Sequence, residues 1–283
     1  MSKINYKIRE YNDGSSILPK GAFRISPSGV NRFFSEKTSW YRENLLDEDK
    51  KFQGSTASEL GNICHHVCEV VANCKITDEK YDSTKLHNAV ANYINELDPD
   101  IYDQSLISSL WEGMSELLVK EYVLQTNTLI TEPFVYNEIL SNIFPSGSID
   151  AITSTAPTDT WEDALKGTNI GVLTIRDWKT TGTKPSSMGY GYTLQIYTYA
   201  WILRQMGVNI EQVELCYAVR PTKTLPARVF NFKKPFDDQA YDFIEGILKL
   251  IAESVQAWNQ FPSCRYLLAA DYRLKIEDLP KAE

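Results

Sequence analysis

The sequence predicts a mixed α/β fold with a helical N-terminal part, and two observations support this prediction. Helical patterns fill most of the first 125 or so residues, whereas segments rich in β-branched and aromatic residues begin at Thr128. From there strands alternate with helices, as expected when helices pack on a sheet. Within 283 residues we expect an irregular segment over 1–24, one domain over 25–265 and a tail over 266–283. The helical part of that domain is expected over about 25–127, and its α/β core over about 128–260.

The N-terminal part should contain several helices. Ser28 would cap the first of them, which carries Val30, Phe33 and Phe34 on one side. Amphipathic patterns then predict further helices over about 56–73, 83–96 and 103–125.

The remaining chain predicts strands and two more helices. Strands are expected over 128–139, 143–153, 170–178, 213–219 and 227–232. One helix should occupy about 193–206 and end at Gly207, and a last helix should begin at Pro235 and reach about residue 258. The resulting order is helices, three strands, a helix, two strands and a helix.

Composition excludes several classes of protein. The formal net charge is -8, which disfavours a protein that coats nucleic acid non-specifically and leaves open a local basic groove or an acidic metal site. The odd count of 5 cysteines disfavours a disulfide scaffold. Cys64, Cys68 and Cys74 are interpreted as buried free thiols and not as a zinc site. No signal peptide or membrane span is recognisable, so we expect a cytoplasmic protein.

Two motifs precede the third expected strand. In Gly61-x-x-x-His65-x-x-x-Glu69, residues four apart share one face of a helix, so His65 and Glu69 can point to the same place. Such a pair is also common on helix surfaces. Asp150, in the strand sequence Gly-Ser-Ile-Asp-Ala-Ile, is unusual because Asp is depleted in strands, although a turn would explain it equally well.

Two further motifs follow. Asp177 and Lys179 are two apart in a strand and share a face, whereas Trp178 should point into the core. A carboxylate beside an ammonium suits a metal with a phosphate next to it, but an ion pair at the sheet end has the same sequence. Gln195 and Tyr199 share a helical face, as they would in any amphipathic helix.

Taken together and in this order, the four motifs closely resemble the PD-(D/E)XK nuclease superfamily, in its RecB-like or phage-type exonuclease branch. The segment from Ile25 to Phe33 with Trp40 and Tyr41 also looks like that branch, so the resemblance covers about residues 25–205. It implies a restriction-endonuclease-like core, a central mixed β-sheet flanked by helices. Some members carry a four-cysteine iron–sulfur cluster, which we do not expect because the required cysteines are missing.

The resemblance also implies a site and its chemistry. Two Mg²⁺ or Mn²⁺ ions would be bound by Asp150 and Asp177, together with the backbone carbonyl of Trp178 and with His65. Lys179 would orient the attacking water and stabilise charge on the phosphate. The remaining members of the site would support it, Glu69 from the first motif and Gln195 and Tyr199 from the fourth. His66 lies ~100° around the helix from His65 and is expected to be a bystander.

DNA contacts are expected from two basic groups, namely Arg176 and Lys184 around the third motif and Arg220, Lys223 and Arg228 in the last hairpin. A solvated hairpin would explain the second group equally well. Tyr190 and Tyr192 are candidates to stack on bases, whereas Tyr197 and Trp201 are expected in the core. No phosphate-binding loop of the helicase type is present.

The function expected from the resemblance is that of a metal-dependent DNA exonuclease in phage-type recombination or DNA end resection. Its partners would be linear duplex ends, a single-strand annealing protein and further copies of the chain, with no membrane. Two alternatives stay open: a structure-specific or single-strand endonuclease, and a non-catalytic DNA-binding module of the same fold.

Overall fold

The structure, a computed structural model, describes residue 4 and residues 6–8, 16–45 and 54–261. The expected tail over 266–283 and much of the expected irregular segment over 1–24 lie outside these residues. The helices are α1 (Pro27–Ser35), α2 (Lys37–Leu45), α3 (Thr56–Ile76), α4 (Ser83–Glu96), α5 (Gln104–Leu118), the π-helical turn η1 (Val119–Val123), α6 (Trp161–Lys166), α7 (Tyr190–Gln205) and α8 (Asp238–Gln260). The strands are β1 (Phe23–Ile25), β2 (Asn127–Thr131), β3 (Phe134–Tyr136), β4 (Ile143–Ser148), β5 (Ala151–Ser154), β6 (Leu173–Thr181), β7 (Ile210–Val219) and β8 (Arg228–Pro235).

The strands form two mixed sheets. The central sheet has the order β2-β5-β6-β7-β8, and a smaller sheet has the order β1-β4-β3. In the central sheet β6 and β7 are parallel and the other pairs are antiparallel. The parallel pair needs a crossover, which α7 supplies. The expected α/β fold with a central mixed sheet and a helical N-terminal part is therefore confirmed.

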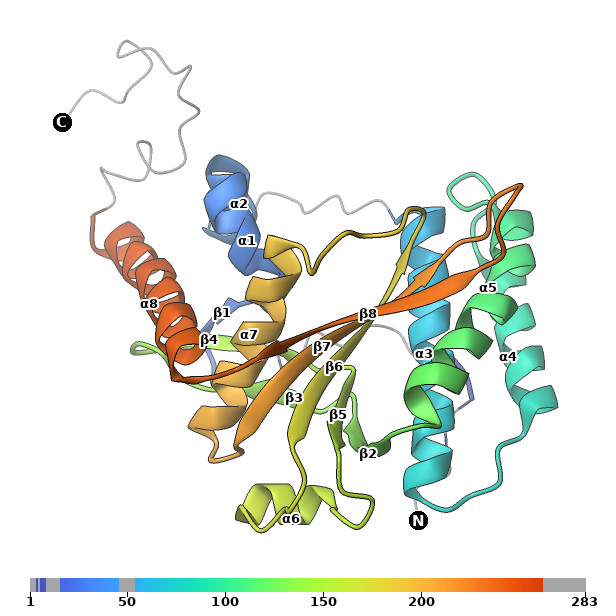
Figure 1. Cartoon of the computed structure of the whole chain (residues 1–283). Helices are drawn as coiled ribbons and strands as arrows, with labels where there is room; N and C mark the ends of the chain where they lie inside the picture. The colour runs from blue at the N-terminus through green and yellow to red at the C-terminus, as the bar shows by residue number, and fades with distance from the viewer. Residues whose placement is uncertain (1–3, 5, 9–15, 46–53, 262–283) are drawn as a thin grey trace.

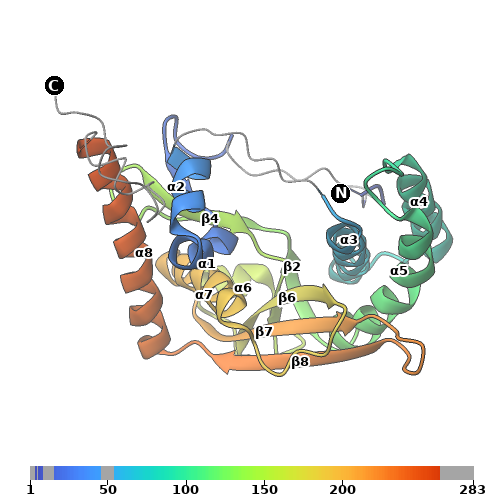
Figure 2. The ribbon, with the colours of Figure 1, turned by 90° about the horizontal axis from the view of Figure 1, so that it is seen from above.

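Helices cover both faces of the central sheet (Figures 1 and 2). Helix α3 contacts β2 and β6, and α5 contacts β7 and β8 on the same side. Helix α7 packs on β6 and β7 from the other side and also reaches β3 and β4 of the small sheet. Helices α1 and α8 in turn pack on α7. The sheet thus separates α3 from α7, and any site at its edge can receive side chains from both.

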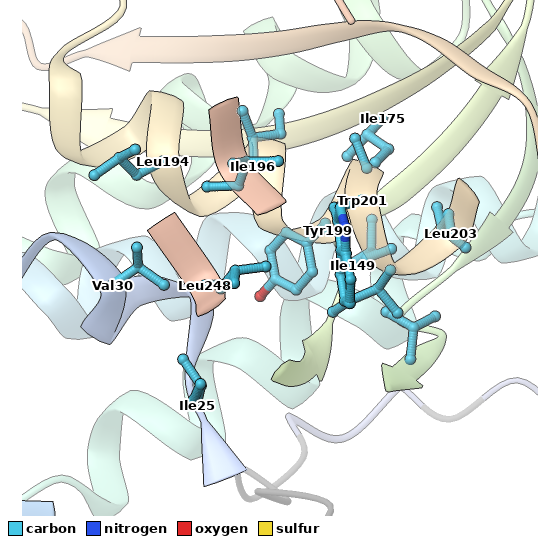
Figure 3. Packing of buried hydrophobic residues seen from close by; sticks show 14 of the residues in the cluster. Ile25, Val30, Ile149, Ile175, Leu194, Ile196, Tyr199, Trp201, Leu203 and Leu248 are labelled. Carbon is cyan, nitrogen blue, oxygen red and sulfur yellow. The ribbon is translucent and has the colours of Figure 1, made fainter. Parts of the chain in front are cut away.

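Two apolar clusters stabilise these layers. One lies on the α7 side and includes Ile175, Leu215 and Trp201. Figure 3 shows part of it, with Tyr199 in the midst of apolar side chains from α7 and its neighbours. The other lies on the α3 and α5 side and includes Trp178. Because β6 contributes to both clusters by strict alternation, its burial fixes which face each of its side chains takes.

Where β4 ends, the chain changes sheets, which the sequence did not reveal. The single strand expected over 143–153 is wrong: Ile149 and Asp150 separate β4 of the small sheet from β5 of the central sheet. The backbone at this point bonds to the loop after β2, with the Ile149 N–H donating to Pro133 O at 3.2 Å. The break therefore places Asp150 at the junction of the two sheets.

Several other boundaries differ from expectation. Ser26 and not Ser28 precedes α1, because Pro27 suits the first helical position. Pro235 ends β8 instead of starting a helix, and Asp237 caps α8 by accepting from the Ala240 N–H at 2.9 Å. Helix α6, which was not expected, is held by a capping box at Thr160.

Candidate active site

Three acidic residues occupy one row across the central sheet. Thr131 pairs with Ala151 between β2 and β5, and Ala151 pairs with Arg176 between β5 and β6. Continuing both registers by one residue places Glu132, Asp150 and Asp177 side by side. The contacts agree, since the Glu132 N–H donates to Asp150 O at 3.3 Å and the Trp178 N–H donates to Asp150 Oδ2 at 2.7 Å.

Strand β6 directs its side chains as the sequence predicted. Asp177 and Lys179 share a face, and Lys179 Nζ lies 2.7 Å from Asp177 Oδ2. Trp178 is 1% exposed and packs in the apolar cluster on the opposite side. The strand therefore presents a carboxylate and an ammonium together, with its indole as the anchor.

Helix α3 delivers His65 to this row. Its Nδ1 lies 3.2 Å from Asp150 Oδ2, and its ring meets that of Trp178 edge-on with centroids 6.2 Å apart. Gly61 allows this approach, because a Cβ there would lie 3.3 Å from Thr180 Oγ1 of β6. The first motif thus combines a close helix–strand contact with a histidine one turn later.

Glu69 and His66 also face the site, which the sequence interpretation did not foresee for His66. His66 Nδ1 lies 3.6 Å from Glu69 Oε2, and its Nε2 is 3.1 Å from Tyr6 O. His66 is 5% exposed and lines the same cleft as His65. His66 was expected to be a bystander, and the structure places its ring at the cleft beside Glu69.

Helix α7 closes the site from the other side of the sheet. Gln195 and Tyr199 both line the cleft. Tyr199 lies against β4, where a Cβ on Gly147 would be only 3.1 Å from its ring and hydroxyl. The absence of a side chain at this glycine therefore sets where the Tyr199 hydroxyl can lie.

These residues line one cleft with a volume of ≈560 Å³. They are contributed by α3, by the ends of β2, β5 and β6, and by α7. The site members that border it are His65, Glu69, Glu132, Asp150, Asp177, Lys179, Gln195 and Tyr199. A cleft of this kind, with converging charged groups, is the usual form of an active site.

The charges in the cleft are strongly coupled. Burial would raise the pKa of Asp150, but His65, Lys179 and the Trp178 N–H outweigh it, so the pKa of Asp150 is lowered. Burial would lower the pKa of His65, and the Asp150 carboxylate reverses this and raises it. Burial would likewise lower the pKa of Lys179, but Asp177 and Asp150 raise it above its ordinary value. Lys179 is therefore a permanent cation at neutral pH.

The pKa values of the other two acids of the row are raised and not lowered. Burial, with the charge of Asp150, raises the pKa of Asp177 to about 6, although Lys179 opposes the shift. Burial and Asp150 also raise the pKa of Glu132 to about 8. The cleft therefore carries more potential negative charge than its own cations neutralise.

This donor set fits a hard divalent cation. Carboxylate oxygens are the ligands that Mg²⁺ prefers, and a bound cation would offset the burial and the repulsion that raise these pKa values. Within the described residues, no three His, Cys, Asp or Glu side chains already converge at metal-binding distance.

Glu132 is the site residue that the sequence interpretation missed. Its φ of 50° lies in the left-handed region, which costs a non-glycine residue of order 1–3 kcal/mol. Such strain persists where surrounding contacts demand it, and here it aims the carboxyl group into the cleft. The available signal was an acidic residue at the end of a strand segment, directly before Pro133.

Arg176 lies away from the cleft and does not fit its expected role in DNA binding. It is 3% exposed on the α3 side of β6, and its Nε donates to Glu214 Oε2 at 2.8 Å. Its Nη1 donates to Thr126 Oγ1 at 2.8 Å and to Tyr122 O. A buried guanidinium with these partners holds β6, β7 and η1 together, so we leave Arg176 out of the DNA-contacting set.

The other expected DNA contacts are accessible. Lys184 and Lys223 are exposed, whereas Arg220 and Arg228 are partly buried. Lys184 Nζ lies 4.4 Å from the centroid of the Phe230 ring, and Arg228 Cζ lies 5.8 Å from it. These side chains lie near the end of the central sheet that carries Lys179, so they stay candidates for phosphate contacts.

The cysteines of the described residues are free and buried, namely Cys64, Cys68, Cys74 and Cys216. This confirms the interpretation of the first three as core thiols. Among the described residues, no helix has the length and apolar character needed to cross a membrane.

Comparisons with known proteins place this geometry in context. The model of the PD-(D/E)XK nuclease superfamily matches residues 24–266. A solved protein from Eubacterium rectale, provisionally named an exonuclease, is similar with 13% identity and a TM-score of 0.49, covering 91% of this chain and 92% of its own. LHK-Exo in complex with dAMP is 13% identical with a TM-score of 0.36, covering 70% of this chain and 92% of its own. No curated protein matches the sequence. At these TM-scores we rest the family assignment on the family model alone.

Proposed function

The chain belongs to the PD-(D/E)XK nuclease superfamily, and from this premise we propose that it is a metal-dependent DNA exonuclease. The observation that supports the proposal is the row of Glu132, Asp150 and Asp177 beside Lys179 in one cleft. Three acids and a permanent cation at one point suit the hydrolysis of a phosphodiester, whose negative charge repels nucleophiles.

Asp150 and Asp177 are the proposed metal ligands, together with the Trp178 carbonyl, His65 and Glu132. A bound divalent cation would supply Lewis acidity toward the phosphate and a lower pKa for water. We propose that two ions bind, and that they are Mg²⁺ or Mn²⁺ because the ligands are mostly oxygen atoms.

The protein's own groups would hold and polarise the substrate. Lys179 stays protonated, so it acts as a fixed positive charge toward the scissile phosphate and not as a base. The His65 ring and the Trp178 N–H fix Asp150 from two sides. Gln195 and Tyr199 project from α7 toward the same cleft, where they would position substrate phosphates.

The substrate context is also a proposal. We propose that one nuclease domain over 25–265 acts on linear duplex ends in the cytoplasm of a bacterium or a phage-infected cell, in recombination or end resection. A single-strand annealing protein and further copies of the chain are the proposed partners. Support comes from the phage-type branch that the motifs resemble, with Lys184, Arg220, Lys223 and Arg228 at one end of the sheet as candidate contacts for the DNA backbone.

A digestion time course in Mg²⁺ tests the activity. It compares end-labelled linear duplex, covalently closed circle and single strand, for the wild type, Asp177→Ala and the control Glu162→Gln on the exposed surface of α6. We expect the wild type to degrade linear DNA and to leave the closed circle intact. This degradation should be abolished in Asp177→Ala and unchanged in Glu162→Gln. Because Asp177 is the ion-pair partner of Lys179, a melting experiment on Asp177→Ala should accompany the assay and show that the variant is folded under the assay conditions.

The alternatives give different results. Cutting of the closed circle would replace the exonuclease by an endonuclease. Undiminished cutting by Asp177→Ala would mean that the site is assigned wrongly. Binding of DNA without hydrolysis, and without uptake of Mn²⁺ in a metal titration, would favour the non-catalytic module.

A further inference from the structure

Lys179 belongs to a second row of side chains, which leads from the cleft to the edge of the sheet. Lys179 pairs with Tyr217 between β6 and β7, and Tyr217 pairs with Phe230 between β7 and β8. Laterally paired residues point to the same face of a sheet. The row Lys179–Tyr217–Phe230 therefore lies on the α7 face, the face that also carries Asp177.

Tyr192 extends the same surface from α7. Its ring centroid lies 5.5 Å from Lys179 Nζ and 6.3 Å from the ring of Tyr217. It is three residues before Gln195, so it shares the helical face that lines the cleft. Yet Tyr192 is 43% exposed, whereas Tyr217 beneath it is 4% exposed. An exposed ring is thus supported by a buried one, next to the permanent cation of the site.

Phe230 lies at the far end of this row and is not explained by core packing. It is partly exposed, and neither apolar cluster includes it. Its ring is instead flanked by cations, with Lys184 Nζ 4.4 Å and Arg228 Cζ 5.8 Å from its centroid. Aromatic faces alternating with cations are the surface that single-stranded nucleic acids bind, with bases stacked on rings and phosphates near cations.

We propose that Tyr192 and Phe230 form a stacking surface for unpaired bases, so that the strand to be cut enters the cleft as single-stranded DNA. This inference rests on the proposed function, since it names the form in which that site takes its substrate. A duplex keeps its bases stacked on one another and would leave both rings unused. Lys184 and Arg228 hold the phosphates between the stacked bases, and Lys179 meets the phosphate that enters the cleft.

The test separates base contacts from phosphate contacts. Fluorescence anisotropy measures, in EDTA so that no hydrolysis occurs, the affinity for a labelled dT12 and for a 12-mer of abasic sites with the same backbone. Stacking contributes ~1–3 kcal/mol per base, so the wild type should bind dT12 at least about tenfold more tightly than the abasic strand. The variants are Tyr192→Ala with Phe230→Ala, Lys184→Gln, and the control Tyr81→Ala, an exposed tyrosine on the segment after α3.

The double variant should lower the ratio of the two affinities at least about fivefold and leave binding of the abasic strand unchanged. Lys184→Gln should weaken both strands alike, and Tyr81→Ala should change neither. Equal binding of the two strands by the wild type would overturn the proposal, as would equal losses for both strands in the double variant. If alanine unfolds the protein in a melting experiment, leucine at both positions keeps the apolar volume and removes the aromatic faces.

The result can be distinguished from failure of the proposed function. A preserved preference for dT12 in a protein that hydrolyses no DNA would reject the nuclease activity and keep the stacking surface. Hydrolysis with no preference for bases would do the opposite. If the affinity for a 12-base-pair duplex falls as much as that for dT12 when Tyr192 and Phe230 are replaced, single-strand entry would be rejected.

Discussion

Replacing Glu132 by Gln should remove a pH dependence that the wild type carries. Burial and Asp150 raise the pKa of Glu132 to about 8 from its ordinary 4.5. The unfolded chain therefore releases this proton near pH 4.5, whereas the folded chain keeps it until about pH 8. Between these values the folded state binds more protons, so stability falls as pH rises through this window and the fall is complete above pH 8. Gln has the shape of the neutral acid and cannot ionise.

The size of this effect follows from the same shift. One pKa unit corresponds to ~1.4 kcal/mol, so the 1.5 units between pH 6.5 and the pKa near 8 give at most ~2 kcal/mol. Water screens part of this, because Glu132 is partly exposed, and we expect about 1–2 kcal/mol. At ~2–4 °C per kcal/mol for a chain of this size, the melting temperature should fall roughly 2–8 °C between pH 6.5 and 9. The window starts above pH 6 to exclude Asp177, whose pKa is raised to about 6 by burial and by Asp150.

Thermal unfolding in EDTA, followed by circular dichroism, measures this difference. The wild type and the control Glu162→Gln should lose stability between pH 6.5 and 9. The loss in Glu132→Gln should be smaller by about 1–2 kcal/mol. Added Mg²⁺ should raise the melting temperature of the wild type more at pH 9 than at pH 6.5, because a metal must displace the Glu132 proton. Parallel curves for wild type and Glu132→Gln would refute the reasoning, since Glu132 would then not be held neutral by its neighbours.

Three further predictions follow from the packing and the charges. Glu214→Leu leaves the buried guanidinium of Arg176 without its carboxylate and should cost ~3–5 kcal/mol in urea unfolding; a loss below ~1 kcal/mol would contradict the structural role of this pair. Gly147→Val should displace Tyr199, since an added Cβ would lie 3.1 Å from its ring, and should cost ~1–3 kcal/mol of stability. In a nuclease assay kcat should fall by a larger factor than KM changes, and a normal kcat would mean that Tyr199 does not need this position. Lys184→Gln should reduce the slope of log affinity against log salt by ~0.7 for single-stranded DNA; an unchanged slope would exclude a phosphate contact at Lys184.

The parts of the site that lie within one element were predictable from the sequence. A strand alternates its side chains, so Asp177 and Lys179 had to share a face and Trp178 had to leave it. A helix repeats every 3.6 residues, so Gln195 and Tyr199 had to project together. These relations depend only on local backbone geometry, which is the same wherever the element lies in the fold.

The parts that join different elements were decided by tertiary structure. Whether Asp150 meets Asp177, and whether Glu132 joins them, depends on the registers of β2, β5 and β6, which are set by side-chain packing between distant segments. Alternation along β6 already turns Arg176 away from the face of Asp177, but only the pairing with β7 supplies Glu214 as its buried partner. The sequence alone therefore determined which side chains each element can offer. Only the pairing of the strands, and the packing of α3 and α7 on opposite faces, decided which of them meet.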